Sequence, residues 1–283
     1  MIKVGLQACS SAEQFLMDPL QTIEAIAAIG YRYIETAGNM FTEQLKTPPN
    51  EIRKHFEYAG IEHVAKHFSF VSMANAEKDI ELLKLIGGKY VVLASDYYES
   101  LDNLLAKCDL FNRIGKRCAE EGLEFVYHNH AHEFQLFGNK PALETIRENT
   151  DPELVHFELD AMWILRGGYD PVEVIKTFGK RVKLLHLSDF HSRYRNAPGY
   201  FDGLDQNIPI TRAFNAEHNI NVSADIGEGI MDIQSILDAA NQYASVDYGF
   251  IELSGSNSIH KDNMLKAAEF GYNALKKYNG VEL

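Results

Sequence analysis

The stretch LEFVYHNHAHEF (residues 123–134) joins a run of strand-forming apolar side chains to three histidines and a glutamate. Side chains alternate along an extended strand, so Val126, His128 and His130 share one face. If Val126 fills the interior of a closed sheet, the two histidines point to its open end. The stretch therefore predicts a buried strand over residues 123–130 that ends in a polar site.

The same alternation of a short strand with a helical stretch recurs along the whole chain. Strands are predicted at residues 2–7, 31–36, 62–70, 89–95, 123–130, 154–160, 181–189 and 247–254. Helices are predicted at 18–30, 47–60, 74–88, 101–121, 142–149, 170–179 and 263–278, with a further helix that begins at Asp232. Asp18 is expected to cap the first helix, Pro19 to open it and Gly30 to end it. Eight such units in 283 residues predict a (β/α)8 TIM barrel, an α/β fold with a single domain over residues 1–283.

Composition narrows the classes of partner. With 46% hydrophobic residues the chain can form a full core, and the net charge of −13 argues against a nucleic-acid partner. No apolar stretch is long enough to span a bilayer, and the N-terminus lacks the apolar core of a signal peptide. Three cysteines, Cys9, Cys108 and Cys118, are interpreted as reduced thiols in the core. We expect a cytoplasmic protein, and a homo-oligomer is compatible with the sequence.

Polar residues recur where the predicted strands end, which is the face of a barrel that carries chemistry. The earlier strands contribute Gln7, Glu35 and His67, and the later ones His128, Glu158 with Asp160, His186 with Ser188, and Glu252. A single strand-end histidine or acid is usually a structural hydrogen-bonding residue. However, His128, Asp160, His186 and Glu252 come from four consecutive strands, which are neighbours in a barrel. Mixed imidazole and carboxylate ligands predict a divalent metal, Mn²⁺, Zn²⁺, Co²⁺ or Fe²⁺ in preference to Ca²⁺, with Mg²⁺ as an alternative.

At these residues the sequence resembles the xylose isomerase-like (β/α)8 superfamily, which contains sugar phosphate isomerases and epimerases, ketose 3-epimerases, inosose dehydratase and endonuclease IV. The resemblance is carried by YHNHAHEF, LDAMWILRGGYDPVEVI, LLHLSDF, DIGEGIMDI and FIELS. It implies a metal held by Glu, Asp, His and Glu from strands five to eight. The last three positions fall on Asp160, His186 and Glu252. His128 occupies the first, so either His128 or Glu133 is expected to supply the fourth ligand.

The resemblance further implies a metal-dependent isomerase or epimerase that acts on a sugar, keto-sugar or sugar phosphate by proton transfer through an enediolate. Glu252 would move the proton, and His130 would be a second catalytic residue. Without a strand-five glutamate, a lyase that dehydrates a keto-sugar or inosose is the alternative, and a sugar-binding barrel without turnover is a third reading. An enzyme like endonuclease IV is disfavoured because it needs further histidine ligands and a basic surface.

Other residues complete the expected site. We assign Glu35, His67, Glu158 and Trp163 to substrate binding, although the only tryptophan could equally be a packed residue at the barrel mouth. Asp189 is expected to orient His186. The segment 192–207, rich in Gly, Asn, Asp and Tyr, is expected to cover the mouth as a lid.

Overall fold

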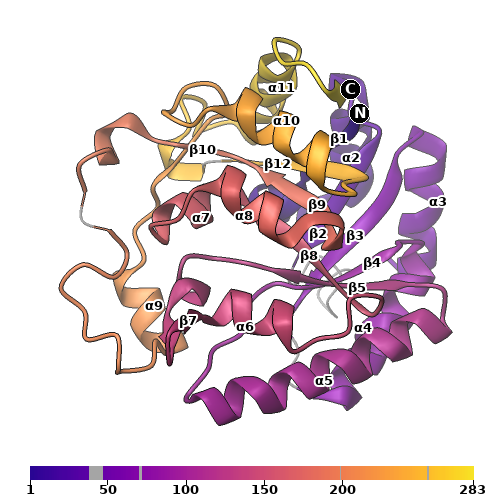
Figure 1. The fold of residues 1–283 in the computed structure, drawn as a ribbon. Coiled ribbons are helices and arrows are strands. Elements are labelled where there is room, and N and C mark those ends of the chain that lie inside the picture. Colours follow the sequence, from indigo (N-terminus) through magenta and orange to yellow (C-terminus); the bar gives the residue numbers. More distant parts are fainter. Residues whose placement is uncertain (38–46, 70–71, 198, 254) are drawn as a thin grey trace.

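The eight predicted strands form the barrel. The computed structural model describes residues 1–37, 47–69, 72–197, 199–253 and 255–283. Within these residues eight parallel strands follow one another in chain order and close into a cylinder because β12 pairs with β1 (Figure 1). They are β1 (Ile2–Gln7), β2 (Tyr33–Ala37), β3 (Glu62–Phe68), β4 (Tyr90–Leu93), β5 (Glu124–His128), β8 (Val155–Asp160), β9 (Val182–Leu187) and β12 (Tyr248–Glu252). The (β/α)8 prediction is confirmed.

Helices surround the barrel. They are α1 (Ala12–Met17), α2 (Pro19–Ile29), α3 (Pro49–Ala59), α4 (Met73–Ile86), α5 (Leu101–Glu120), α6 (Ala142–Glu148), α7 (Ala161–Arg166), α8 (Pro171–Phe178), α9 (Arg212–His218), α10 (Ile233–Tyr243) and α11 (Met264–Leu275). The start of α2 follows the sequence prediction: Asp18 accepts a hydrogen bond from the backbone N–H of Gln21, Pro19 is the first residue, and Gly30 ends the helix at a φ of 127°. No described helix is both long and apolar enough to cross a membrane.

Several short elements were not predicted. They are the helices α1, α7 and α9, the antiparallel pair β10 (Asp189–Phe190) and β11 (Ser223–Ala224), the pair β6 (Leu136–Phe137) and β7 (Lys140–Pro141), and β13 (Val281–Glu282) beside β1. Elements of two to seven residues have too few positions to show a periodic apolar pattern.

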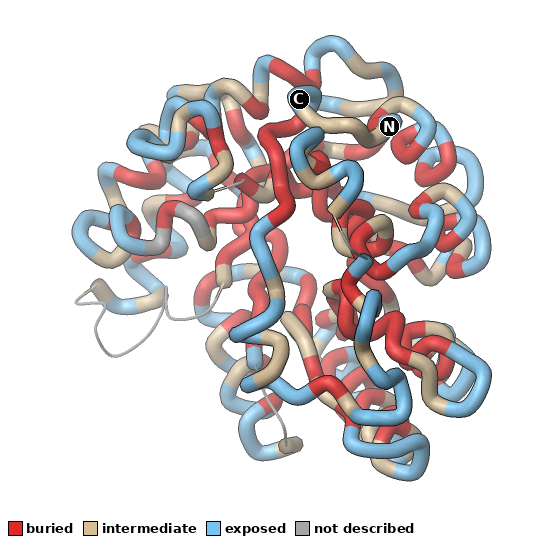
Figure 2. Tube along the Cα trace, turned by 90° about the vertical axis from the view of Figure 1, so that its left-hand side faces the viewer, coloured by how far each residue is buried: buried red, intermediate tan, exposed pale blue. Residues whose placement is uncertain are grey.

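The interior of the barrel has its own apolar cluster, separate from the core between strands and helices. We call Tyr90, Val92, Val126, Leu184, Tyr248 and Phe250 the lower layer. Figure 2 shows buried residues concentrated on the central strands and exposed residues on the outer turns. A Cβ at Gly5 would lie 2.6 Å from the Phe250 ring, so glycine leaves the space that this ring fills. Val126 belongs to this interior cluster, so its side chain points inward, as the alternation along its strand predicts.

The end of the fifth strand departs from the prediction. The strand ends at His128, two residues early, because the next polar groups find other partners. The Asn129 side chain accepts a hydrogen bond from the backbone N–H of Asp160, and the backbone N–H of His130 donates to Glu133 Oε2. The first bond joins the ends of β5 and β8, and the second holds Glu133 against the end of β5.

Candidate metal centre

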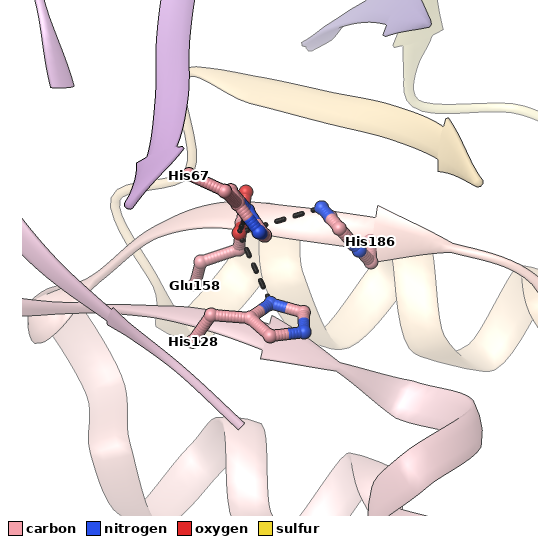
Figure 3. A group of neighbouring side chains, drawn as sticks. All are labelled: His67, His128, Glu158 and His186. Carbon is pink, nitrogen blue, oxygen red and sulfur yellow. Dashed lines mark hydrogen bonds and ion pairs between the residues drawn. The ribbon is translucent and has the colours of Figure 1, made fainter. Parts of the chain in front are cut away.

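A polar layer lies above the lower layer, at the C-terminal ends of the strands. We call Gln7, Glu35, His67, His128, Glu158 and His186 the upper layer. All six are at most 7% exposed. Figure 3 shows three of its histidines converging on the carboxylate of Glu158.

Two carboxylate oxygens hold the upper layer together. Glu158 Oε2 lies 2.7 Å from His67 Nε2 and 3.0 Å from His128 Nδ1. Glu35 Oε2 lies 2.7 Å from His186 Nε2 and accepts a hydrogen bond of 2.6 Å from Gln7 Nε2. The second oxygen of each carboxylate is buried without a hydrogen-bond partner among the described residues.

Burial and the two carboxylates act in opposite directions on the histidines. Burial by itself lowers the pKa of His67, but Glu35 and Glu158 outweigh it and raise the pKa to about 9. The pKa of His186 is likewise raised despite its burial, mainly by Glu158. Burial and the neighbouring His186 instead lower the pKa of His128. In the metal-free protein the two carboxylates are therefore balanced by protonated His67 and His186, beside a neutral His128.

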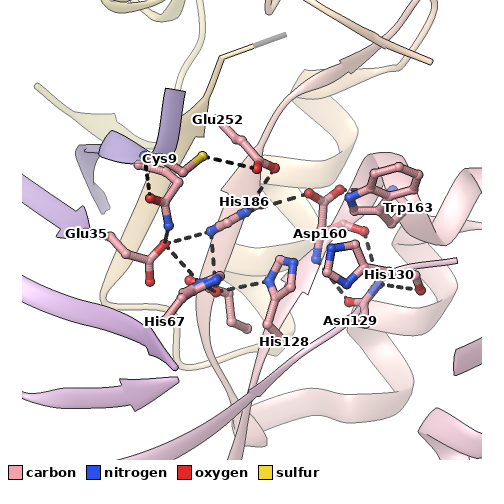
Figure 4. Close-up of polar contacts among 12 residues, drawn as sticks. Cys9, Glu35, His67, His128, Asn129, His130, Asp160, Trp163, His186 and Glu252 are labelled. Carbon is pink, nitrogen blue, oxygen red and sulfur yellow. Dashed lines mark hydrogen bonds and ion pairs between the residues drawn. The ribbon is translucent and has the colours of Figure 1, made fainter. Parts of the chain in front are cut away.

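A second group of ligand atoms lies on the outer side of His186. Its Nδ1 atom is 3.3 Å from Glu252 Oε2 and 3.7 Å from Asp160 Oδ2 (Figure 4). Asp160 Oδ1 caps α7 by accepting the backbone N–H of Trp163, whereas Oδ2 is buried without a hydrogen-bond partner among the described residues. Burial and the charge of Glu252 raise the pKa of Asp160 to about 8. Two close carboxylates and an unpartnered oxygen are what a cation would stabilise.

These three residues fit a divalent transition metal. One imidazole nitrogen and two carboxylates suit Mn²⁺, Zn²⁺ or Co²⁺, and the three ligand atoms lie within 4.8 Å of one another. A metal-bound histidine usually donates its second ring N–H to a carboxylate. Glu35 provides that acceptor for His186, since it lies at Nε2 while Asp160 and Glu252 face Nδ1.

The two candidates for a fourth ligand lie in different places. His128 belongs to the upper layer and uses Nδ1 for Glu158. Glu133 is fully buried next to a different set of groups: it accepts hydrogen bonds from the Tyr127 hydroxyl and the His130 backbone, and its Oε1 lies 3.2 Å from His132 Nε2. The structure thus groups Glu133 with His130 and His132 rather than with Asp160 and Glu252.

The remaining predicted residues divide between the two levels. The centroid of the His130 ring lies 5.4 Å from the centroid of the Trp163 ring and 5.0 Å from that of the His128 ring. Burial lowers the pKa of His130 to about 3, so its imidazole is neutral, and Nδ1 has no hydrogen-bond partner among the described residues. Glu35, His67 and Glu158, assigned to substrate binding from the sequence, lie beneath His186 in the upper layer.

Two sequence interpretations are corrected. Cys9 is not a core residue: it is partly exposed, and its Sγ lies 3.7 Å from Glu252 Oε1, while Cys108 and Cys118 are buried as expected. Asp189 does not orient His186; its carboxylate accepts backbone N–H groups of Phe190, Gly227, Gly229 and Met231. Strand parity could have found Cys9, because it continues the alternation of Gly5 and Gln7.

Part of the long connection after β9, which includes the predicted lid, packs against the barrel mouth. Tyr200 is buried with Ala131 and Ile210, and its backbone N–H donates to the carbonyl of Arg166. Its hydroxyl donates to the side chain of Asn215 in α9. Closure on a substrate stays a prediction.

The fold and these strand ends define an α/β barrel with a candidate metal centre at the C-terminal face. A family model described as xylose isomerase-like TIM barrel matches residues 23–272, and the chain belongs to this family.

The chain is also similar to individual proteins. It is 27% identical over 201 residues to an inosose dehydratase of Geobacillus kaustophilus (strain HTA426). The matched region covers 60% of this chain and 61% of that protein. The chain thus spans less than two thirds of this relative. A sugar phosphate isomerase/epimerase from Parabacteroides distasonis ATCC 8503 shares the fold with a TM-score of 0.77 and 23% identity, covering 99% of this chain and 96% of the other. The IolI protein with a bound zinc atom has a TM-score of 0.72 and 15% identity, covering 98% and 97%.

Proposed function

We propose that this protein is a divalent-metal-dependent isomerase or epimerase that moves a proton at the carbon beside the carbonyl of a sugar or keto-sugar. The observation that carries the proposal is the convergence of Asp160, His186 and Glu252 on one point at the strand ends, where Asp160 Oδ2 has no hydrogen-bond partner among the described residues. The similarity to proteins named as sugar isomerases, epimerases and an inosose dehydratase supports the substrate class.

The metal would be held by Asp160, His186 and Glu252. When bound, it would polarise the substrate carbonyl and so increase the acidity of the neighbouring carbon-bound proton. Glu252 would accept that proton, because 29% of its side chain is exposed whereas Asp160 is fully buried. His130 and Trp163 would contact the substrate beside it. Glu35 and Glu158 lie below, where they would orient the imidazoles of His186, His67 and His128.

A dehydratase is the second candidate, favoured by the asymmetry of the site. A reaction with two opposed carboxylate bases needs a second acid near strand five, but His128 stands there and Glu133 faces Tyr127 and His132. In a one-base elimination, Glu252 would take the proton from the carbon beside the carbonyl. It would then return that proton to the hydroxyl leaving the next carbon, so that water and a carbon–carbon double bond form. The similarity to an inosose dehydratase supports this candidate.

The two candidates give different products in deuterated water. Metal-free protein reloaded with Mn²⁺, Co²⁺ or Zn²⁺ would be incubated with ketoses, 3-keto-sugars and an inosose, and followed by proton NMR and mass spectrometry. An isomerase or epimerase gives an isomer with carbon-bound deuterium, whereas a dehydratase gives a product lighter by one water. Glu252→Gln should abolish either reaction. Saturable binding of a sugar without exchange or product would overturn the catalytic proposal and leave a sugar-binding barrel.

A further inference from the structure

The turn after β1 brings a thiol to the candidate metal centre. Cys9 lies in the 3-10 turn Ala8–Ser11, two residues beyond Gln7. Because the barrel closes between β1 and β12, Gln7 is the register partner of Glu252. Cys9 Sγ consequently lies 3.7 Å from Glu252 Oε1, within reach of a weak hydrogen bond from the thiol.

Cys9 completes a closed ring of polar contacts (Figure 4). Its backbone N–H donates to Gln7 Oε1 at 3.0 Å, and Gln7 Nε2 donates to Glu35 Oε2 at 2.6 Å. The same Glu35 oxygen lies 2.7 Å from His186 Nε2, and His186 Nδ1 lies 3.3 Å from Glu252 Oε2. The two oxygens of Glu252 thus have different partners, Oε1 the thiol and Oε2 the imidazole.

We propose that Cys9 is a positioning residue that fixes the rotation of the Glu252 carboxylate. The terminal torsion of a glutamate is broad and roughly two-fold, so the carboxylate needs a partner to define its orientation. With Oε1 held by the thiol, Oε2 faces His186 and Asp160, where a metal would bind. Groups that orient a ligand in this way typically contribute ten- to hundredfold to metal affinity or activity. The inference rests on the proposed metal centre and goes beyond it by giving strand one a part in the site.

Three variants separate this role from a general effect on the turn. Cys9→Ala removes the donor, and Cys9→Ser keeps a smaller hydroxyl donor that reaches Glu252 after a small shift of the carboxylate. Ser11→Ala is the matched control, because Ser11 is buried in the same turn but donates to the carbonyl of Ala8. We expect Cys9→Ala to weaken Mn²⁺ or Co²⁺ binding about tenfold by isothermal titration calorimetry. Cys9→Ser should stay within about threefold of the unsubstituted protein, and Ser11→Ala should leave the affinity unchanged while lowering the Tm.

Alkylation tests the same point without a substitution. Cys108 and Cys118 are at most 1% exposed, so iodoacetamide should modify Cys9 first in the native protein, as checked by peptide mass mapping. The modified sulfur has no proton to donate, and Mn²⁺ affinity should fall at least as far as in Cys9→Ala.

Equal affinities for Cys9→Ala and the unsubstituted protein would overturn the inference, as would an equal loss in Ser11→Ala. Undiminished affinity after complete alkylation of Cys9 would contradict it independently. Absence of metal binding by the unsubstituted protein is a distinct result, since it would overturn the proposed function itself and the inference with it.

Discussion

The lower and upper layers of the barrel interior are buried to a similar degree but are opposite in chemistry. Val126 and Phe250 in the lower layer are fully buried, and so are Glu35 and Glu158 in the upper layer. Apolar side chains gain free energy from this burial, whereas buried ionised groups are stable only when they are paired. Five ionisable side chains in one buried layer therefore destabilise the fold unless they are paired. The inward-facing residues at the C-terminal ends of most strands thus serve a site, whereas the inward-facing residues below them fill the core.

The largest effect should come from His186, which belongs both to the upper layer and to the candidate metal ligands Asp160, His186 and Glu252. His186 contacts Glu35 on one side and faces Asp160 and Glu252 on the other. His186→Ala should weaken metal binding more than about hundredfold, because a ligand and its orienting contact are both lost. It should also lower the free energy of unfolding by about 3–5 kcal/mol, since a buried carboxylate loses its cation. Calorimetry with Mn²⁺ and urea unfolding would measure the two effects, and near-unchanged affinity would contradict the site assignment.

The matching variant in the lower layer should separate stability from binding. Phe250 lies two residues before Glu252 on the same strand and face. Phe250→Ala should lower the free energy of unfolding by about 3–5 kcal/mol through the cavity it leaves. The metal affinity should stay within about threefold of that of the unsubstituted protein. It would be measured by calorimetry under conditions in which the variant is fully folded. A loss of affinity as large as in His186→Ala would remove the functional distinction between the layers.

The two layers should also differ in their dependence on pH. The folded-state pKa of His67 is raised to about 9, above the value of about 6.5 expected in an unfolded chain. Its stabilising contribution is therefore complete below about pH 6.5 and is lost as the pH rises towards 9. The loss should be up to about 3 kcal/mol in the metal-free protein.

The measurement is urea unfolding between pH 6 and 9.5 in the presence of chelator. His67→Asn should flatten the curve relative to the unsubstituted protein, because asparagine does not titrate. Val126→Ala, in the lower layer, should shift the curve down without changing its slope. Parallel curves for all three proteins would show that folding does not raise the pKa of His67.

The smallest effect on stability is expected at the barrel mouth. Asp202, Gly203 and Asp205 lie at the exposed tip of the long connection, beyond the buried Tyr200. Replacing residues 202–205 by two glycines should lower the free energy of unfolding by less than about 2 kcal/mol, because only Leu204 of the four packs against the Tyr200 cluster and it is partly exposed. Turnover should fall about tenfold or more if the segment excludes water from the reaction. Proportionate losses of stability and turnover would identify a structural element instead of a lid.

Strand alternation predicted which side chains point into the barrel, including those of the candidate metal ligands. Val126 and His128 face inward as expected, and Asp160, His186 and Glu252 meet. Alternation does not specify depth, however. Glu158 and Asp160 share a face, but one binds His67 and His128 below while the other faces Glu252 above. A difference of two residues along a strand separates an orienting group from a candidate ligand.

Residues beyond the strand ends were the hardest to place from the sequence. Glu133 folds back onto the His130 backbone, and Asp189 is used by the backbone of the turn at Gly227 and Gly229. Both positions depend on the path of a loop, which has no period from which a direction could be read. Cys9 was misassigned for a different reason: free cysteines are usually buried, and residue type was given more weight than position.

Anomalous scattering from crystals of the Mn²⁺-loaded protein would locate the metal. We expect one peak about 2.0–2.3 Å from Asp160 Oδ2, His186 Nδ1 and Glu252, with Glu35 retaining its contact to His186 Nε2. A peak among His67, His128 and Glu158 would place the metal in the upper layer and contradict the assignment. Full Mn²⁺ loading in solution with no peak at either cluster would show that the metal binds elsewhere on the protein.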